Sequence, residues 1–155
     1  MSQSPSTSVG PISLTPPADW QIASLILVGP ADTPSQSPGA AATPFQQNLV
    51  VISERVDAGE TLDGYIGKQT GKLKDQGLMH RPPGPLEKVA MGGGREGALF
   101  EHVVLGPSGE KVRQMQLVSL KGNLLYALIA SHLDGLAFEA ARATFSGMLR
   151  SVKLA

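Results

Sequence analysis

The stretch that decides the fold runs from Phe45 to Gln76 and reads FQQNLVVISERVDAGETLDGYIGKQTGKLKDQ. Its first part, Phe45 to Arg55, is rich in β-branched and other apolar residues and becomes polar at its end. Such a composition favours a β-strand. The second part has the pattern of a helix, so the block predicts a strand followed by a helix. Because the block carries little obvious chemistry, it indicates a binding domain.

The helix of this block has clear start and stop signals. Thr61 is expected to be the N-cap, and the helix dipole favours Asp63 in the first turn. The helix is predicted to run to about Asp75, and Gly77 is a typical residue just beyond a helix end.

The two sides of this helix differ in composition. One side carries an apolar stripe of Leu62, Tyr65, Ile66, Gln69 and Leu73. Gly64, Gly67 and Gly71 lie on the opposite side, and each interior glycine costs roughly 1 kcal/mol relative to alanine. Two interpretations stay open. Either the glycines form a smooth groove for self-association, or they are neutral sequence variation on a side that faces solvent.

The rest of the chain predicts more strands and one more helix. A final helix is expected from a cap at Asp134 to about Arg150, with apolar residues spaced by three, four or seven. Grouped strands with two main helices predict an α+β fold, an antiparallel sheet of about six to seven strands. The further strands are expected at residues 12–14, 23–28, 86–91, 98–105, 111–120 and 124–131.

Chain length and composition indicate one domain. A chain of 155 residues is long enough for one core, which we expect to span residues 11–155. Residues 1–10 are Ser-rich and are expected to be disordered. Residues 29–44 are rich in Pro, Ser, Ala and Gly, and we expect a flexible loop there.

Charge and composition exclude several classes of function. Thirteen basic residues balance thirteen acidic ones without a basic run, which argues against nucleic acid as a partner. There is no cysteine, so disulfides and thiolate chemistry are excluded. No apolar run reaches the roughly 20 residues of a membrane span, and the N-terminus lacks an apolar signal segment. We therefore expect a cytoplasmic protein without direct membrane insertion, unless a signal precedes this sequence.

The chain carries no evident catalytic set. None of His80, His102 and His132 has the spacing of a metal ligand, and there is no Gly-x-Ser-x-Gly elbow. His102 is expected to be a cross-strand partner and His132 a helix-boundary residue. The glycines at 92–94 lack a following Gly-Lys-Ser/Thr and predict a turn. We expect no enzyme, no metal and no cofactor.

Several predicted strands are apolar on both faces. An antiparallel sheet with one wet face should alternate apolar and polar residues, and residues 25–28 and 124–130 do not. Either two helices on opposite faces bury everything, or part of one face is an apolar groove for a partner. Gln114 and Gln116 share a face with Val112 and Val118. They are either hydrogen-bonding groups of such a groove or ordinary solvent-facing glutamines.

A set of short motifs, in this order, resembles the DcrB-like domain family of the PsbP-like fold over about residues 11–155. The motifs are Asp19-Trp20 before an apolar strand, Asn48-Leu49-Val50-Val51, Glu60-Thr61-Leu62-x-x-Tyr65, Gly93-Gly94, Gly109-x-x-Val112-x-Gln114-x-Gln116, and a last helix with Phe145 and Ser151. The 29–44 loop looks longer than is usual for this family.

One branch of this family is the Eag group of cytoplasmic adaptor chaperones, which bind the N-terminal transmembrane helices of type VI secretion effectors. The resemblance implies a homodimer that shields such hydrophobic helices before export. It implies that the partner-binding residues are Leu25, Leu27, Val50, Gln69 and either Gln114 or Gln116. The alternative is a structural protein of the cell envelope without catalytic activity. The envelope lipoprotein DcrB represents that branch, and its lipobox cysteine has no counterpart here.

Overall fold

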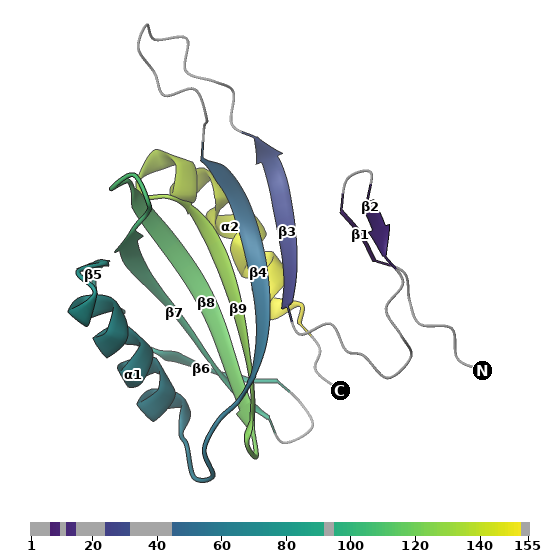
Figure 1. Ribbon diagram of the computed structural model, residues 1–155, viewed down its shortest axis with the longest axis vertical. Coiled ribbons are helices and arrows are strands. Elements are labelled where there is room, and N and C mark those ends of the chain that lie inside the picture. Colours follow the sequence, from purple (N-terminus) through teal and green to yellow (C-terminus); the bar gives the residue numbers. More distant parts are fainter. Residues whose placement is uncertain (1–6, 10–11, 15–23, 32–44, 92–94, 153–155) are drawn as a thin grey trace, which may run out of the picture.

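The computed structural model describes residues 7–9, 12–14, 24–31, 45–91 and 95–152. It confirms the predicted α+β class with a seven-stranded antiparallel sheet and two helices (Figure 1). The sheet order is β3-β4-β9-β8-β7-β5, and β6 also pairs with β7. β1 and β2 pair with each other as a separate two-stranded sheet. The bounds are β1 Thr7–Val9, β2 Ile12–Leu14, β3 Ser24–Ala31, β4 Gln46–Arg55, α1 Leu62–Asp75, β5 Met79–Arg81, β6 Glu87–Ala90, β7 Glu96–Leu105, β8 Lys111–Lys121, β9 Leu124–Leu133 and α2 Leu136–Arg150.

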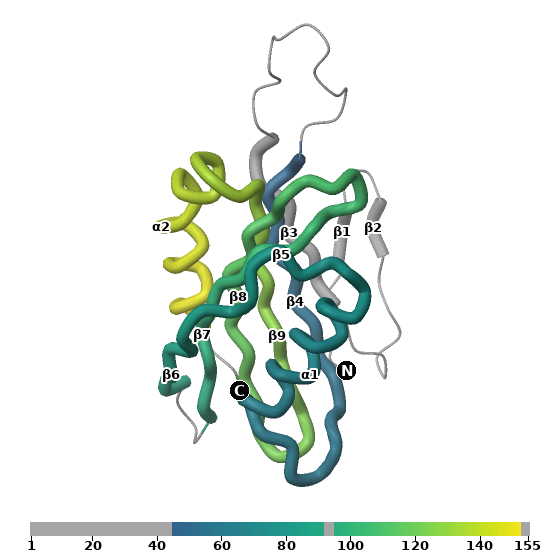
Figure 2. Tube along the Cα trace, turned by 90° about the vertical axis from the view of Figure 1, so that its left-hand side faces the viewer, coloured from purple at the N-terminus to yellow at the C-terminus, as the bar shows by residue number. Residues whose placement is uncertain are grey.

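The two helices lie on opposite faces of the sheet (Figures 1 and 2). Strand residues alternate between these faces, so each helix packs on its own apolar cluster. Phe138 and Phe145 of α2 pack on residues such as Met115, while Leu62 and Ile66 of α1 pack on the other face. Apolar residues on both faces of the central strands are therefore explained mainly by two helices, one on each side.

The helix termini confirm two expectations and correct one. The Thr61 side chain accepts a hydrogen bond from the Gly64 N–H at 3.0 Å, and Gly77 has a φ of 69° beyond the end of α1. Asp134 does not cap α2. Gly135 is the N-cap, with a φ of 100° that favours glycine. The Asp134 carboxylate instead accepts a hydrogen bond from Arg113 Nε at 2.8 Å.

Some strands are longer than expected. β3 continues to Ala31 across an irregularity in its pairing after Val28, and its Pro30 is compatible with an edge strand. Thr7–Val9 forms a strand inside the segment expected to be disordered. β9 continues to Leu133, so His132 lies in a strand rather than at a helix boundary. The rest of the expected 29–44 loop lies outside the described residues.

The two helices are too short and too polar to cross a membrane: no helix in the described part of the chain meets both requirements.

Candidate functional site

Helix α1 covers only part of its face of the sheet. It packs on β5, β7 and β8 and reaches Leu125 and Ala127 of β9, and in the described part of the chain no helix lies over β4 on that side (Figure 1). On the uncovered strip, Val50 pairs with Ile129, and Ile52 lies beside buried Ala127 at the edge of α1. Val50, Ile52 and Ile129 are half-buried, so this strip offers apolar surface beside the helix.

A cavity of about 310 Å³ lies where the uncovered strip meets α1; we call it the α1 cavity. Its lining combines apolar residues with polar residues that come from both α1 and the sheet. That combination is typical of binding sites. Among the lining residues Glu54 is the only acidic one, and neither Lys nor Arg occurs. The lining comprises Ile52, Glu54, Tyr65, Ile66, Gln69, Thr70, Leu73, Phe100, His102, Gln114, Gln116, Val118, Ala127 and Ile129.

Three polar residues of the lining, His102, Gln114 and Gln116, form a connected set with Ser131 next to the cavity, which we call the polar ladder. Nε2 of His102 lies 2.7 Å from Oε1 of Gln114. Nε2 of Gln116 lies 3.0 Å from Nε2 of His102 and 3.3 Å from Oε1 of Gln114. Nε2 of Gln114 donates to the Ser131 hydroxyl at 3.3 Å.

Strand register brings the polar ladder together. His102 pairs directly with Gln114, which pairs directly with Ser131 on its other side. Gln116 is two residues further along β8 and so shares their face. His102 is only 5% exposed, and burial lowers the pKa of its ring while the bond to Gln114 opposes this. His102 is thus a cross-strand partner, as predicted.

The start of α1 closes one end of the cavity. The Tyr65 hydroxyl donates to the Glu54 carboxylate at 3.1 Å and so ties α1 to β4. Partial burial raises the pKa of Tyr65 to about 12, and the bond to Glu54 adds to the effect. The phenol therefore stays protonated and keeps this tie at neutral pH.

The structure brings together three of the predicted partner-binding residues and places the others apart. Gln69, Gln114 and Gln116 all line the α1 cavity, so register alone does not choose between the last two. Val50 lies beside the cavity, opposite Ile129.

The pairing of β3 with β4 places Leu25 and Leu27 at positions on the α2 face of the sheet. Leu25 occupies the position opposite Val51, and Leu27 that opposite Leu49. Leu49 and Val51 belong to the cluster under α2, on the other face. The position opposite Val50 is that of Ile26. The positions of Leu25 and Leu27 are therefore not brought together with the glutamines.

Sequence reasoning missed His102, Ser131, Ile52 and Ile129 as parts of this site. Their signal was the two-residue periodicity of each strand. That signal becomes useful only when the pairing of β7, β8 and β9 is known, because register decides which residues face each other.

The glycines of α1 do not share one environment. A Cβ added at Gly67 or Gly71 would meet no atom within 4 Å, so both lie on open surface. A Cβ at Gly64 would lie 2.5 Å from the Glu60 carboxylate, which bonds the Thr61 N–H at the helix start. Gly64 is therefore accounted for by the capping arrangement, and self-association through the other two stays a prediction.

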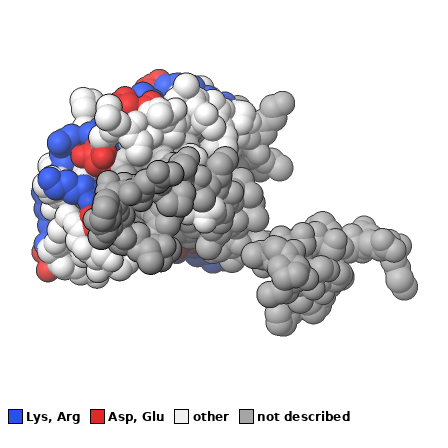
Figure 3. All heavy atoms as spheres, turned by 90° about the horizontal axis from the view of Figure 1, so that it is seen from above, with Lys and Arg blue, Asp and Glu red and all other residues white. Residues whose placement is uncertain are grey.

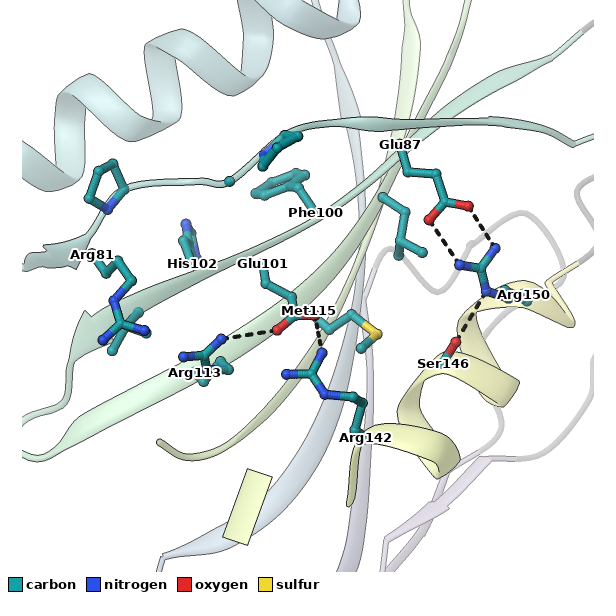
Figure 4. Close-up of a pocket in the computed structure, with 15 residues that line it drawn as sticks. Arg81, Glu87, Phe100, Glu101, His102, Arg113, Met115, Arg142, Ser146 and Arg150 are labelled. Atoms are coloured by element: carbon teal, nitrogen blue, oxygen red, sulfur yellow. Dashed lines mark hydrogen bonds and ion pairs between the residues drawn. The ribbon is translucent and has the colours of Figure 1, made fainter. Parts of the chain in front are cut away.

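A second cavity of about 410 Å³ lies on the α2 side and is dominated by ion pairs (Figure 4). Arg113 bonds Glu101 at 3.2 Å and Asp134 at 2.8 Å. Arg142 bonds the same Glu101 and also Glu139. Because each of these arginines already has two carboxylate partners, the network serves to fasten α2 to the sheet.

Charged side chains on the surface are mixed rather than segregated. On the face seen in Figure 3, basic and acidic residues lie beside one another, in keeping with the balanced composition. In the described part of the chain, no cluster of three or more His, Asp or Glu residues could hold a metal ion. The α1 cavity is thus the better candidate for a functional site.

Comparisons with known proteins identify a protein of similar fold but give no function. No protein-family model and no curated protein matches the chain. Among solved structures, the chain is similar to PA94 from Pseudomonas aeruginosa, a protein of unknown function proposed to be a regulator. The TM-score is 0.67, the sequence identity is 11%, and the match covers 99% of each chain. At this identity the likeness shows a shared fold alone.

Proposed function

We propose that this protein is a non-enzymatic adaptor chaperone that binds an apolar helical segment of a client on the α1 side of its sheet. The observation that carries the proposal is the half-covered face: an apolar strip on β4 and β9 runs directly into the α1 cavity. The client helix would lie along the strip, and side chains on one of its sides would enter the cavity.

The energetics favour such an arrangement. An apolar helix in water exposes a large surface, at about 25 cal/mol per Å². Val50, Ile52 and Ile129 would bury part of that surface, and they would also be buried themselves. A cavity of about 310 Å³ has room for a few side chains but not for a whole helix, so the strip must supply the remaining contact.

The polar groups suit a helix better than a small metabolite. The amide groups of Gln69, Gln114 and Gln116 line the cavity without any basic residue. Such groups can bond to small polar side chains of a client, and without Lys or Arg the lining offers no countercharge for an anionic metabolite. This favours a largely apolar segment with occasional polar positions.

The resemblance to the Eag group supports a more specific client. It implies Gln69 and one of Gln114 and Gln116, and all three glutamines line one cavity, on the face proposed to bind. We infer that the client is the hydrophobic N-terminal region of a type VI secretion effector. The chaperone would act in the cytoplasm, as a homodimer, before the effector is exported.

Co-expression tests this function directly. The N-terminal region of the effector encoded beside this protein is expressed with the wild type, with Ile52→Asp, or with Leu136→Asp. Leu136 is 90% exposed at the start of α2, so it controls for the new charge. The wild type and Leu136→Asp should keep the effector region soluble, and Ile52→Asp should not. Equal solubility of the effector region with and without the wild type would overturn the proposal.

A further inference from the structure

The side of β4 that faces α1 changes from apolar to acidic along the strand. Val50, Ile52 and Glu54 are two residues apart, so they share this face of the sheet. Val50 lies on the uncovered strip opposite Ile129, and Glu54 lies at the other end, where Tyr65 ties the start of α1 to the strand. The strip therefore ends in a carboxylate that lines the α1 cavity.

One oxygen of this carboxylate is held and the other is open. Oε2 of Glu54 accepts a hydrogen bond from the Tyr65 hydroxyl at 3.1 Å. Oε1 makes no hydrogen bond or ion pair with any described residue, and the side chain is exposed. Both oxygens of a carboxylate accept hydrogen bonds. Glu54 can therefore take a donor from a partner while it keeps its bond to Tyr65.

The surroundings of Glu54 favour a cationic donor. Neither Lys nor Arg lines the α1 cavity, so the lining holds no cation that would compete for the carboxylate. Two other acidic side chains near the start of α1 already have basic partners, because Glu60 pairs with Lys68 and Asp63 with Lys88. Glu54 thus places an uncompensated negative charge directly beside an apolar surface.

We propose that Glu54 recognises a basic residue at the end of the apolar stretch of the client. The inference rests on the proposed function and adds to it the chemistry of one client position. A Lys or Arg side chain of the client would donate to Oε1 of Glu54 while apolar residues of the client lie on Val50 and Ile52. An acidic residue in the same place would meet a like charge, so Glu54 also selects against clients with an acidic flank.

The spacing along β4 sets where the basic residue must stand. Two residues of a strand span about 7 Å, so Glu54 lies about 14 Å along the strand from Val50. A helix rises about 1.5 Å per residue, so a client helix parallel to β4 brings to Glu54 a residue about nine positions beyond the one on Val50. The basic residue is thus expected about two and a half helical turns from the client residue that contacts Val50.

Three synthetic helical peptides test this preference. They share one apolar stretch, a neutral hydrophilic tail at one end and blocked termini, and they carry Lys, Gln or Glu at the other end. Their Kd values are measured by fluorescence anisotropy with the wild type, Glu54→Gln, Glu54→Lys and Asp57→Asn. Asp57 lies between β4 and α1 and does not line the cavity, so Asp57→Asn controls for the loss of one negative charge near this end.

The wild type should bind the Lys peptide about two- to fivefold more tightly than the Gln peptide, and the Glu peptide least tightly. This preference should shrink in about 1 M salt, because salt screens exposed charges. Glu54→Gln keeps a carbonyl oxygen for the Tyr65 hydroxyl and should bind the three peptides about equally. Glu54→Lys should reverse the order, and Asp57→Asn should keep the order of the wild type.

Two results would overturn the role of Glu54 but not the proposed function: equal binding of the three peptides to the wild type, or a preference for Lys that survives in Glu54→Gln. Binding of none of the peptides to the wild type would overturn both. If Glu54→Lys does not fold, the comparison of Glu54→Gln with Asp57→Asn decides the outcome, because both variants remove one charge and keep an acceptor oxygen.

Discussion

Val50 of β4 and Ile129 of β9 lie directly opposite each other in the sheet, and both side chains stay half-buried on the face that carries α1. On the opposite face, neighbouring Leu49 and Leu128 are fully buried under α2. At these positions the sheet is thus buried on the α2 side and only half-buried on the α1 side. This asymmetry distinguishes the molecule from a sandwich whose helices cover both faces, and the account of its function depends on it.

Asp134 contributes stability that depends on pH. The guanidinium of Arg113 holds the pKa of the Asp134 carboxyl below its usual value. A depressed carboxyl pKa stabilises the fold above the unfolded-state pKa of about 3.9, and this stabilisation is lost as the pH falls through the lower folded value. Asp134→Asn should therefore be less stable than the wild type near pH 7, and the difference should shrink toward pH 3. Urea unfolding at a series of pH values measures this. A difference that stays constant with pH would contradict the assignment.

Two glycine-to-alanine changes should have opposite effects. A Cβ at Gly67 meets no atom within 4 Å in the middle of α1, so Gly67→Ala should stabilise the fold by about 0.5–1 kcal/mol. Gly135 has a φ of 100°, so Gly135→Ala should destabilise it by at least about 1 kcal/mol. The free energies of unfolding in urea give both values. Effects of the same sign would show that one of the two backbone environments is described wrongly.

Self-association through the glycine side of α1 has its own test. Gly67→Leu places a large side chain on open surface, so the monomer should stay folded while a dimer formed through this side weakens. Sedimentation equilibrium measures the dimerisation constant, and circular dichroism checks the fold. A dimerisation constant that Gly67→Leu leaves unchanged would remove the glycine side as an interface.

The fold class was within reach of the sequence because its signals are local. Apolar strand segments and the Thr61 cap each depend on a few neighbouring residues, and both agree with the structure. The N-cap of α2 was predicted wrongly at Asp134. Its carboxylate pairs with Arg113, which is distant in the sequence, so no local pattern reveals this partner.

The candidate site was only partly within reach. The two glutamines of β8 could be assigned to one face from their spacing. The faces of Leu25 and Leu27 depend on how β3 pairs with β4, and His102 joins the glutamines only through the pairing of β7 with β8. Register between strands is set by the whole sheet, so it cannot be read from one strand.

The central claim is that the uncovered strip beside α1 binds an apolar helix, and one affinity comparison tests it most directly. The Kd of a synthetic apolar helical peptide with Lys at both ends is measured with the wild type, with Ile129→Asp and with Leu136→Asp. The aspartate at position 129 would be buried without a partner under the peptide, so binding should weaken at least about tenfold. Leu136→Asp should bind like the wild type. Equal Kd values for all three proteins would contradict the account.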